Sequence, residues 1–165
     1  MADPANKVPS SPYPATNAEF AGMSEADAIT RMLNSSKTIA VVGLSSNRMR
    51  ASFHVAEYLQ SAGYKIIPVN PNETAVLGEK SYARLQDVPI SIDVVQIFRR
   101  TIFVPEIVEA AIQIKARRVW MQEGIVNAEA AERAQRAGIF VVMNKCMLKE
   151  HVKRSRSVQI AKPNT

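Results

Sequence analysis

The chain has 165 residues, of which 47% are hydrophobic and 22% charged, values typical of a soluble globular domain and too short a length for two full cores. No apolar run approaches the roughly 20 residues that span a bilayer, and we expect no signal peptide, because the N-terminus lacks an apolar stretch. Cys146 is the only cysteine, which excludes an internal disulfide and a cysteine-based zinc site. These features predict a cytoplasmic protein without membrane attachment.

The net charge of +6 is concentrated near the C-terminus. Residues 145–165 contain six lysines and arginines against one acid, Glu150, so the rest of the chain is about neutral. A basic end on a neutral domain is more typical of a solvated segment, or of a counter-charge for an anionic ligand, than of a duplex-reading surface. We therefore expect a basic tail over residues 152–165 and no nucleic-acid partner.

The first 22 residues contain four prolines among small polar residues, which predicts a disordered or loosely packed lead. A helix is expected to follow, with Ser24 as its N-cap and Asp27 completing a capping box. The domain proper is expected over residues 23–151.

From residue 38 onward, short apolar runs alternate with amphipathic stretches. Pro68 lacks an amide donor, so we place it near a strand end or on a side without a ladder partner. The alternation predicts an α/β fold, a Rossmann-like doubly wound parallel sheet of about five strands in three layers, α/β/α. The expected strands are 38–42, 64–69, 93–98, 118–121 and 139–143, and the expected helices between them include 52–62, 104–115 and 127–137.

Ligands of open parallel sheets bind beyond the carboxyl ends of the strands, near the point where strand order reverses. The residues that follow the five expected strands combine cationic, amide, hydroxyl and glycine groups, which suit a polyanion. These candidate ligand-binding residues are Gly43, Leu44, Ser45, Ser46, Asn47, Arg48 and Ser52 after the first strand, Asn70, Pro71 and Asn72 after the second, Arg99 and Arg100 after the third, Gln122, Glu123 and Gly124 after the fourth, and Asn144, Lys145 and Cys146 after the fifth.

The loop after the first strand carries the strongest signal. Gly43 allows a sharp turn, and the following serines and asparagine offer short donors. The N-terminus of the next helix, near Ser52, adds unpaired amides and a partial positive charge of about +0.5. The loop therefore predicts a phosphate site, although any strand-to-helix connection needs a glycine and a helix cap.

The dinucleotide motif G-x-G-x-x-G is not met, since only its first glycine is present. An NAD site also expects an acidic residue at the end of the second strand, for the ribose hydroxyls. Asn70 and Asn72 stand there instead, and neutral amides tolerate a phosphorylated ribose. The sequence thus favours NADP or coenzyme A (CoA) over NAD.

Several short motifs, in this order and spacing, make the chain resemble the stand-alone CoA-binding domain family. That family is similar to the CoA-binding N-terminal domain of the succinyl-CoA synthetase α subunit. The likeness extends from about Lys37 to His151. The motifs are Val41–Ser45, Ile67–Pro71, Leu77–Lys80, Val94–Arg100 and Asn144–Cys146.

The resemblance implies a CoA-binding Rossmann fold in which Ser45–Arg48 meet the phosphates, Asn70–Asn72 lie along the adenosine part and Met121–Gly124 line the pantetheine side. Two departures matter. Relatives often carry proline in the first loop where this chain has Ala51, and the synthetase's phosphorylated histidine lies in a second domain that this sequence lacks. We therefore expect no ligase activity.

Single residues admit competing interpretations. Cys146 is either a thiol that meets the sulfur end of CoA, since the neighbouring Lys145 would increase its thiolate fraction, or a small buried hydrophobe. Glu123 is expected to cap a helix or pair with a lysine rather than to act in catalysis. His54 and His151 have no partners at the spacing of a triad or a metal site.

Adjacent residues of a strand point to opposite faces, so we expect one of Arg99 and Arg100 to point at the ligand. The other is expected to pair with Glu106 or to face solvent. Trp120, inside an apolar strand, is expected in the core.

The leading hypothesis is a protein that binds CoA or an acyl-CoA, with no catalytic residue, no metal and no evident catalytic apparatus. An NADP-dependent oxidoreductase using the same loop is the alternative, although no Tyr-x-x-x-Lys pair is evident. A third class is an interaction protein whose basic tail holds a partner. The expected ligand is a small nucleotide, and an exposed strand edge would allow a homodimer.

Overall fold

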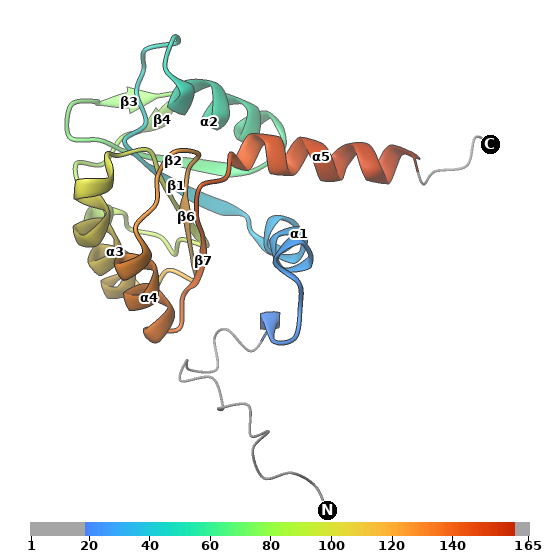
Figure 1. Ribbon diagram of the computed structural model, residues 1–165. Helices are drawn as coiled ribbons and strands as arrows, with labels where there is room; N and C mark the ends of the chain where they lie inside the picture. Colours follow the sequence, from blue (N-terminus) through green and yellow to red (C-terminus); the bar gives the residue numbers. More distant parts are fainter. Residues whose placement is uncertain (1–18, 161–165) are drawn as a thin grey trace, which may run out of the picture.

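The computed structural model describes residues 19–160, with side chains for residues 19–156. Its centre is a five-stranded parallel sheet in the order β2-β1-β5-β6-β7 (Figure 1). A two-stranded antiparallel pair, β3–β4, follows β2 in the chain. The strands are β1 (Thr38–Val42), β2 (Lys65–Val69), β3 (Ala75–Val76), β4 (Glu79–Lys80), β5 (Val94–Ile97), β6 (Arg118–Met121) and β7 (Phe140–Val142).

Helices cover both faces of the large sheet and complete three layers (Figure 1). On one face pack α1 (Glu25–Ser35), α2 (Ala51–Ser61) and α5 (Met147–Ile160). On the other pack α3 (Val104–Gln113), α4 (Ala128–Arg136) and the 3-10 turn η2 (Leu85–Asp87), while η3 (Thr101–Phe103) leads into α3. The predicted Rossmann-like doubly wound sheet is confirmed.

The strand order places the reversal between β1 and β5. The chain runs from β1 outward to β2, then crosses back to β5 on the other side of β1. The carboxyl ends of β1 and β5 therefore flank the crevice in which doubly wound sheets bind ligands.

Local sequence signals explain most element ends. Ser24 caps α1 by accepting the Asp27 amide at 3.1 Å, and Asn127 caps α4 by accepting the Ala130 amide at 2.9 Å. Gly63, directly after α2, has φ +103°, the left-handed conformation that ends helices.

Pro68 lies in the edge strand β2. Its neighbours in the strand donate toward β1, as the Lys65 amide does to the Lys37 carbonyl at 2.8 Å, so the missing amide of Pro68 faces the outer edge. There its carbonyl accepts the Tyr82 amide at 3.0 Å. The expectation for this proline is confirmed.

The C-terminal region differs from the predicted tail. The expected boundary at residue 152 falls inside α5, and the Arg154 guanidinium binds the Ala26 carbonyl at 3.0 Å and Thr30 Oγ1 at 2.7 Å. Arg154 is therefore part of the packed domain, because α5 continues past residue 152 and brings this side chain against α1. None of the helices between residues 19 and 160 is long and apolar enough to cross a membrane.

The N-terminal lead mostly lies outside the described residues, but its last part is packed. Phe20 is buried, with its ring centroid 4.4 Å from that of Phe140. Glu19 accepts a 2.7 Å hydrogen bond from Arg118, whose side chain is buried at the start of β6. A buried guanidinium needs a compensating charge, so these residues are not a loose lead.

Two helix boundaries also differ from expectation. α3 ends at Gln113 rather than at Lys115, because Lys115 adopts φ +57° and leaves the helix. α2 begins at Ala51, one residue before the expected Ser52, which places Arg50 at the cap position.

Candidate functional site

The loops after β1 and β5 lie against each other at Gly43. Its φ is +91°, and a Cβ on this residue would lie 2.9 Å from the Phe98 carbonyl oxygen and 3.1 Å from Arg99 Cδ. Real Cβ atoms do not come this close to backbone, so the position requires glycine for both conformation and space. Gly43 thereby allows the two loops to meet at the reversal point.

The loop from Gly43 to Arg50 is held by its own side chains. The Ser45 amide donates to Ser52 Oγ at 3.2 Å, the Asn47 amide to Ser45 Oγ at 3.1 Å, and the Met49 amide to Asn47 Oδ1 at 2.9 Å. The sequence predicted these hydroxyl and amide groups as ligand donors. In the structure they satisfy the loop backbone and fix its shape.

Unpaired donors lie instead at the N-terminus of α2. Arg50 caps the helix without a side-chain hydrogen bond. Within residues 19–160, the amides of Ala51 and Ser52 have no hydrogen-bond acceptor. They line a cavity of about 330 Å³ together with Gly43, Ser45, Arg50 and Phe98. Free amides, a helix dipole and an adjacent arginine are features that favour an anion.

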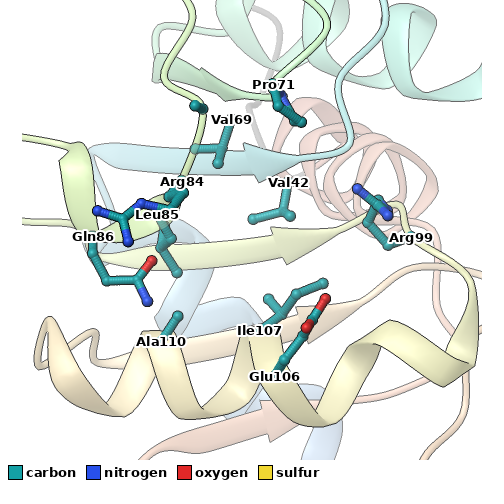
Figure 2. A pocket seen from close by; sticks show the side chains of 11 residues that line it. Val42, Val69, Pro71, Arg84, Leu85, Gln86, Arg99, Glu106, Ile107 and Ala110 are labelled. Atoms are coloured by element: carbon teal, nitrogen blue, oxygen red, sulfur yellow. The ribbon is translucent and has the colours of Figure 1, made fainter.

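A second cavity of about 310 Å³ lies on the α3 side of the same strand ends (Figure 2). Its floor is apolar, whereas Arg84 and Gln86 lie at one end and Arg99 at the opposite end (Figure 2). Such a slot with a cationic rim suits a flat, partly apolar group that carries a charge. The apolar lining comes from Val42, Val69, Pro71, Ala83, Leu85, Ile107 and Ala110.

The rim charges of this second cavity are partly paired. Arg84 bonds to Asp87 at 2.9 Å, and this hydrogen bond lowers the pKa of the Asp87 carboxyl. The Arg99 guanidinium lies 4.4 Å from the centre of the Phe103 ring, and Glu106 shares the cavity lining with it. Of the two predicted arginines, Arg99 lines the cavity and Arg100 is exposed. Both arginines lie beyond the end of β5, in the bend that leads to η3, so the course of this loop and not strand alternation separates them.

The loop after β2 mainly braces the first loop. Asn70 Nδ2 donates to the buried Leu44 carbonyl at 3.0 Å, and Asn70 Oδ1 accepts the Asn72 amide at 3.0 Å. Leu44 is fully buried, while Pro71 lines the second cavity. The side chain of Asn70, predicted to lie along the ligand, is therefore committed to joining two loops.

The loops after β6 and β7 bond to each other. The Gly124 amide donates to Asn144 Oδ1 at 2.8 Å, and Glu123 pairs with Lys149 at 3.0 Å, which raises the pKa of that lysine. The lysine partner expected for Glu123 is thus present. Gln122 is buried, and its Oε1 accepts Gln96 Nε2 at 3.2 Å.

The last predicted residues sit beside the start of α5. Trp120 is fully buried and donates its indole N–H to the Lys145 carbonyl at 2.7 Å, while Lys145 Nζ lies 3.6 Å from Glu25. Cys146 is half-buried against the apolar cluster below α5. Neither of the two cavities at the β1–β5 crevice includes these residues or those after β6.

Comparison with known proteins identifies the family to which the chain belongs. Residues 37–152 match the family model described as "CoA binding domain". The chain belongs to this CoA-binding domain family. The resemblance to this family that the short motifs indicated is thereby confirmed.

Two relatives match this CoA-binding domain over most of their length. YneT of Bacillus subtilis, described as uncharacterized, is 40% identical over 123 residues, 74% of this chain and 91% of that protein. A hypothetical protein from Pyrococcus horikoshii has a solved structure with TM-score 0.77 and 39% identity, covering 80% of this chain and 92% of that one.

A longer relative matches over a smaller part. The ADP-forming acetate–CoA ligase II of Archaeoglobus fulgidus is 33% identical over 79 residues. That match takes in 47% of this chain and 12% of the ligase.

Sequence reasoning missed several residues that the structure brings to the crevice. Arg50, Ala51 and Phe98 line the first cavity, and the η2 region supplies one end of the second. Arg50 could have been found from the helix pattern if the start of α2 had been placed one residue earlier. Nothing local indicated the η2 contribution, since it depends on how a long connection folds back onto α3.

No group of three or more His, Cys, Asp and Glu side chains that could hold a metal ion occurs in the part of the chain that the structure describes. The two histidines lie apart from the crevice. His54 is exposed on α2, and His151 packs between Tyr58 and Tyr64.

Proposed function

We propose that this CoA-binding domain binds coenzyme A or an acyl-CoA at the β1–β5 crevice, and that binding itself is its function. The observation that carries the proposal is the N-terminus of α2, which has no side-chain cap and whose first two residues line a cavity at the strand-order reversal. A phosphate group is the ligand that such a helix end favours.

The two cavities divide the ligand between them. The diphosphate is assigned to the cavity at Ala51 and Ser52, and the adenosine to the apolar slot beside α3. The neighbouring residues Val42 and Gly43 line one cavity each, so a single ligand can pass from one to the other across Gly43. Arg99, at the end of the slot near Gly43, is placed to meet a phosphate.

The pantetheine arm is assigned to the side of β6, toward Gln122, Glu123 and Gly124. These residues end the strand next to β5 along the carboxyl edge of the sheet. An extended arm leaving the diphosphate can follow this edge. We assign no side chain to the end of this arm, so the proposal covers both CoA, with its free thiol, and an acyl-CoA.

Isothermal titration calorimetry against CoA and dephospho-CoA tests the proposal. We expect CoA to bind and dephospho-CoA to bind more weakly, because two arginines, Arg84 and Arg99, line the adenosine slot against one carboxylate, that of Glu106. Absence of binding at millimolar CoA would refute the function. Equal affinities would show that the ribose phosphate is not read.

NADPH, tested in parallel by saturation-transfer NMR, separates the proposal from the oxidoreductase alternative. Both ligands carry a diphosphate and a phosphorylated ribose, so the first loop alone does not distinguish them. We expect CoA to displace NADPH. Tighter binding of NADPH than of CoA would favour the oxidoreductase.

A further inference from the structure

Ser46 holds a carboxylate. Its amide nitrogen and its Oγ lie 3.0 and 2.9 Å from one and the same oxygen, Oε1 of Glu73. Two donors that converge on a single oxygen, one from the backbone and one from the side chain, are a small oxyanion site. The tip of the first loop is therefore an anion-binding position, and in this structure an acid of the same chain occupies it.

The loop does not depend on Glu73 for its shape. Three hydrogen bonds within residues 45–52 fix the conformation of this loop, and Asn70 Nδ2 donates a further one to the Leu44 carbonyl where the loop begins. Each of those acceptors is neutral. Among the amides of residues 45–50 whose acceptors the structure describes, the Ser46 amide alone has a charged one.

Apart from its two hydrogen bonds to Ser46, the Glu73 carboxylate has few interactions with the rest of the protein. Its side chain is half-buried and forms no ion pair within the described residues, although Arg48 and Arg50 lie in the loop that it touches. The diphosphate of CoA carries more acceptor oxygens than a carboxylate and, with a negative charge on each of its two phosphates, more charge in total. It can therefore take over both Ser46 donors and expel the carboxylate into solvent.

We infer that Glu73 is an internal competitor for the ligand's phosphate at Ser46, and that it leaves Ser46 when the ligand binds. The inference rests on the proposed function, because it assigns a phosphate of CoA to the first loop. Glu73 then weakens the binding of every ligand that must displace it. It raises specificity, since a ligand without a phosphate at this position has nothing with which to expel the carboxylate.

The test compares the wild type, E73Q and E79Q by isothermal titration with CoA at 20 mM and 500 mM NaCl. E79Q is the matched control, because Glu79 lies in the adjoining β4, is half-buried like Glu73 and loses the same charge without touching Ser46. We expect E73Q to bind CoA about five- to tenfold more tightly than the wild type at low salt. E79Q should change the affinity by less than about twofold, and salt should shrink the gain of E73Q.

The outcomes are distinct. An E73Q affinity equal to or weaker than that of E79Q, with an unchanged melting temperature, means that Glu73 braces the loop rather than competes, and overturns the inference while leaving CoA binding intact. Binding by E73Q where the wild type binds poorly supports it. No binding by any of the three proteins refutes the proposed function and the inference together.

If E73Q lowers the melting temperature, a second variant decides. S46G removes the hydroxyl that Glu73 accepts and keeps the amide. In the E73Q background, S46G should weaken CoA binding, because the phosphate then loses a donor. An unchanged CoA affinity in the double variant would show that no phosphate uses the Ser46 hydroxyl, one of the two donors that Glu73 occupies, and would overturn the inference.

Discussion

At Gly43 the absence of a side chain sets the geometry of the whole crevice. The residue combines a left-handed backbone with a carbonyl oxygen, that of Phe98, within 2.9 Å of where a Cβ would stand. The sequence indicated the glycine and the turn. It did not indicate the contact with Phe98, because residues 43 and 98 are brought together by pairing of β1 with β5.

Replacing Gly43 by alanine should destabilise the protein and abolish CoA binding. The left-handed conformation costs an L-residue about 1–2 kcal/mol, and the clash with Phe98 adds to it, so we expect a loss of more than about 2 kcal/mol in urea unfolding. G78A is the control, since Gly78 has φ +76° and nothing within 4 Å of its Cβ position. Equal losses in the two variants would show that the contact with Phe98 is unimportant.

Arg99 and Arg100 offer a second comparison between neighbours. Arg99 lines the second cavity, whereas Arg100 is exposed. We expect R99Q to weaken CoA binding about tenfold or more, since hydrogen bonds to charged groups contribute about 1.5–3 kcal/mol, and R100Q to change it less than about twofold. Calorimetric titration checks both. A larger effect of R100Q would place the ligand outside this cavity.

Among the elements, α5 shows how composition alone misleads. The six basic residues and lone acid over residues 145–165, a span that extends beyond α5, predicted a basic tail from residue 152, yet within α5 Arg154 is bonded to α1 and His151 to α2. The amphipathic signal of this helix is weak, because long polar side chains make the contacts. Conversely, β1 was readily predicted as a continuous apolar run, which is typical of a strand buried on both faces, and β5 departs from that pattern only at Gln96.

The packing of α5 on α2 predicts a pH dependence. His151 Nδ1 lies 2.8 Å from the Tyr58 hydroxyl, and burial lowers the pKa of His151 below its ordinary value. In the unfolded chain a histidine takes up a proton near pH 6.5, while the folded one stays neutral to lower pH. Stability should therefore fall as the pH drops below about 6.5 toward the folded pKa.

Urea unfolding between pH 8 and 5.5 measures this effect in the wild type, H151Q and H54Q. H151Q should flatten the pH dependence over this range, at some cost in stability from the lost contact with Tyr58. H54Q, at an exposed position of α2, should retain it. If the free energy of unfolding of H151Q depends on pH as steeply as that of the wild type, a group other than His151 is responsible for the pH dependence.

Considered as a whole, the molecule has its proposed ligand site at the carboxyl edge of the parallel sheet. Both cavities lie where β1 and β5 end, and the residues that line them range in the sequence from Val42 to Ala110. A ligand that contacts all of these segments binds only the folded chain, in which they lie together. Its binding must therefore raise the stability of the entire domain.

Thermal unfolding with CoA measures this linkage. At a hundred times the dissociation constant, the ligand should stabilise the fold by about 2.7 kcal/mol, which raises Tm by several degrees for a domain of this size. G43A should show no ligand-dependent shift. A wild-type Tm that is independent of CoA concentration would contradict the proposed function.

The sequence by itself determined the fold class, the five main strands and the caps at Ser24 and Asn127, because buried strands and helix ends depend on local apolar runs and short-range hydrogen bonds. It also indicated the region of the site, since the carboxyl ends of parallel strands share one edge. Only the tertiary structure decided which polar groups are free. Ser45, Asn47 and Asn70 satisfy backbone groups, whereas the amides at the start of α2 stay open, and such competition between neighbouring donors and acceptors is settled by distances that no residue pattern contains.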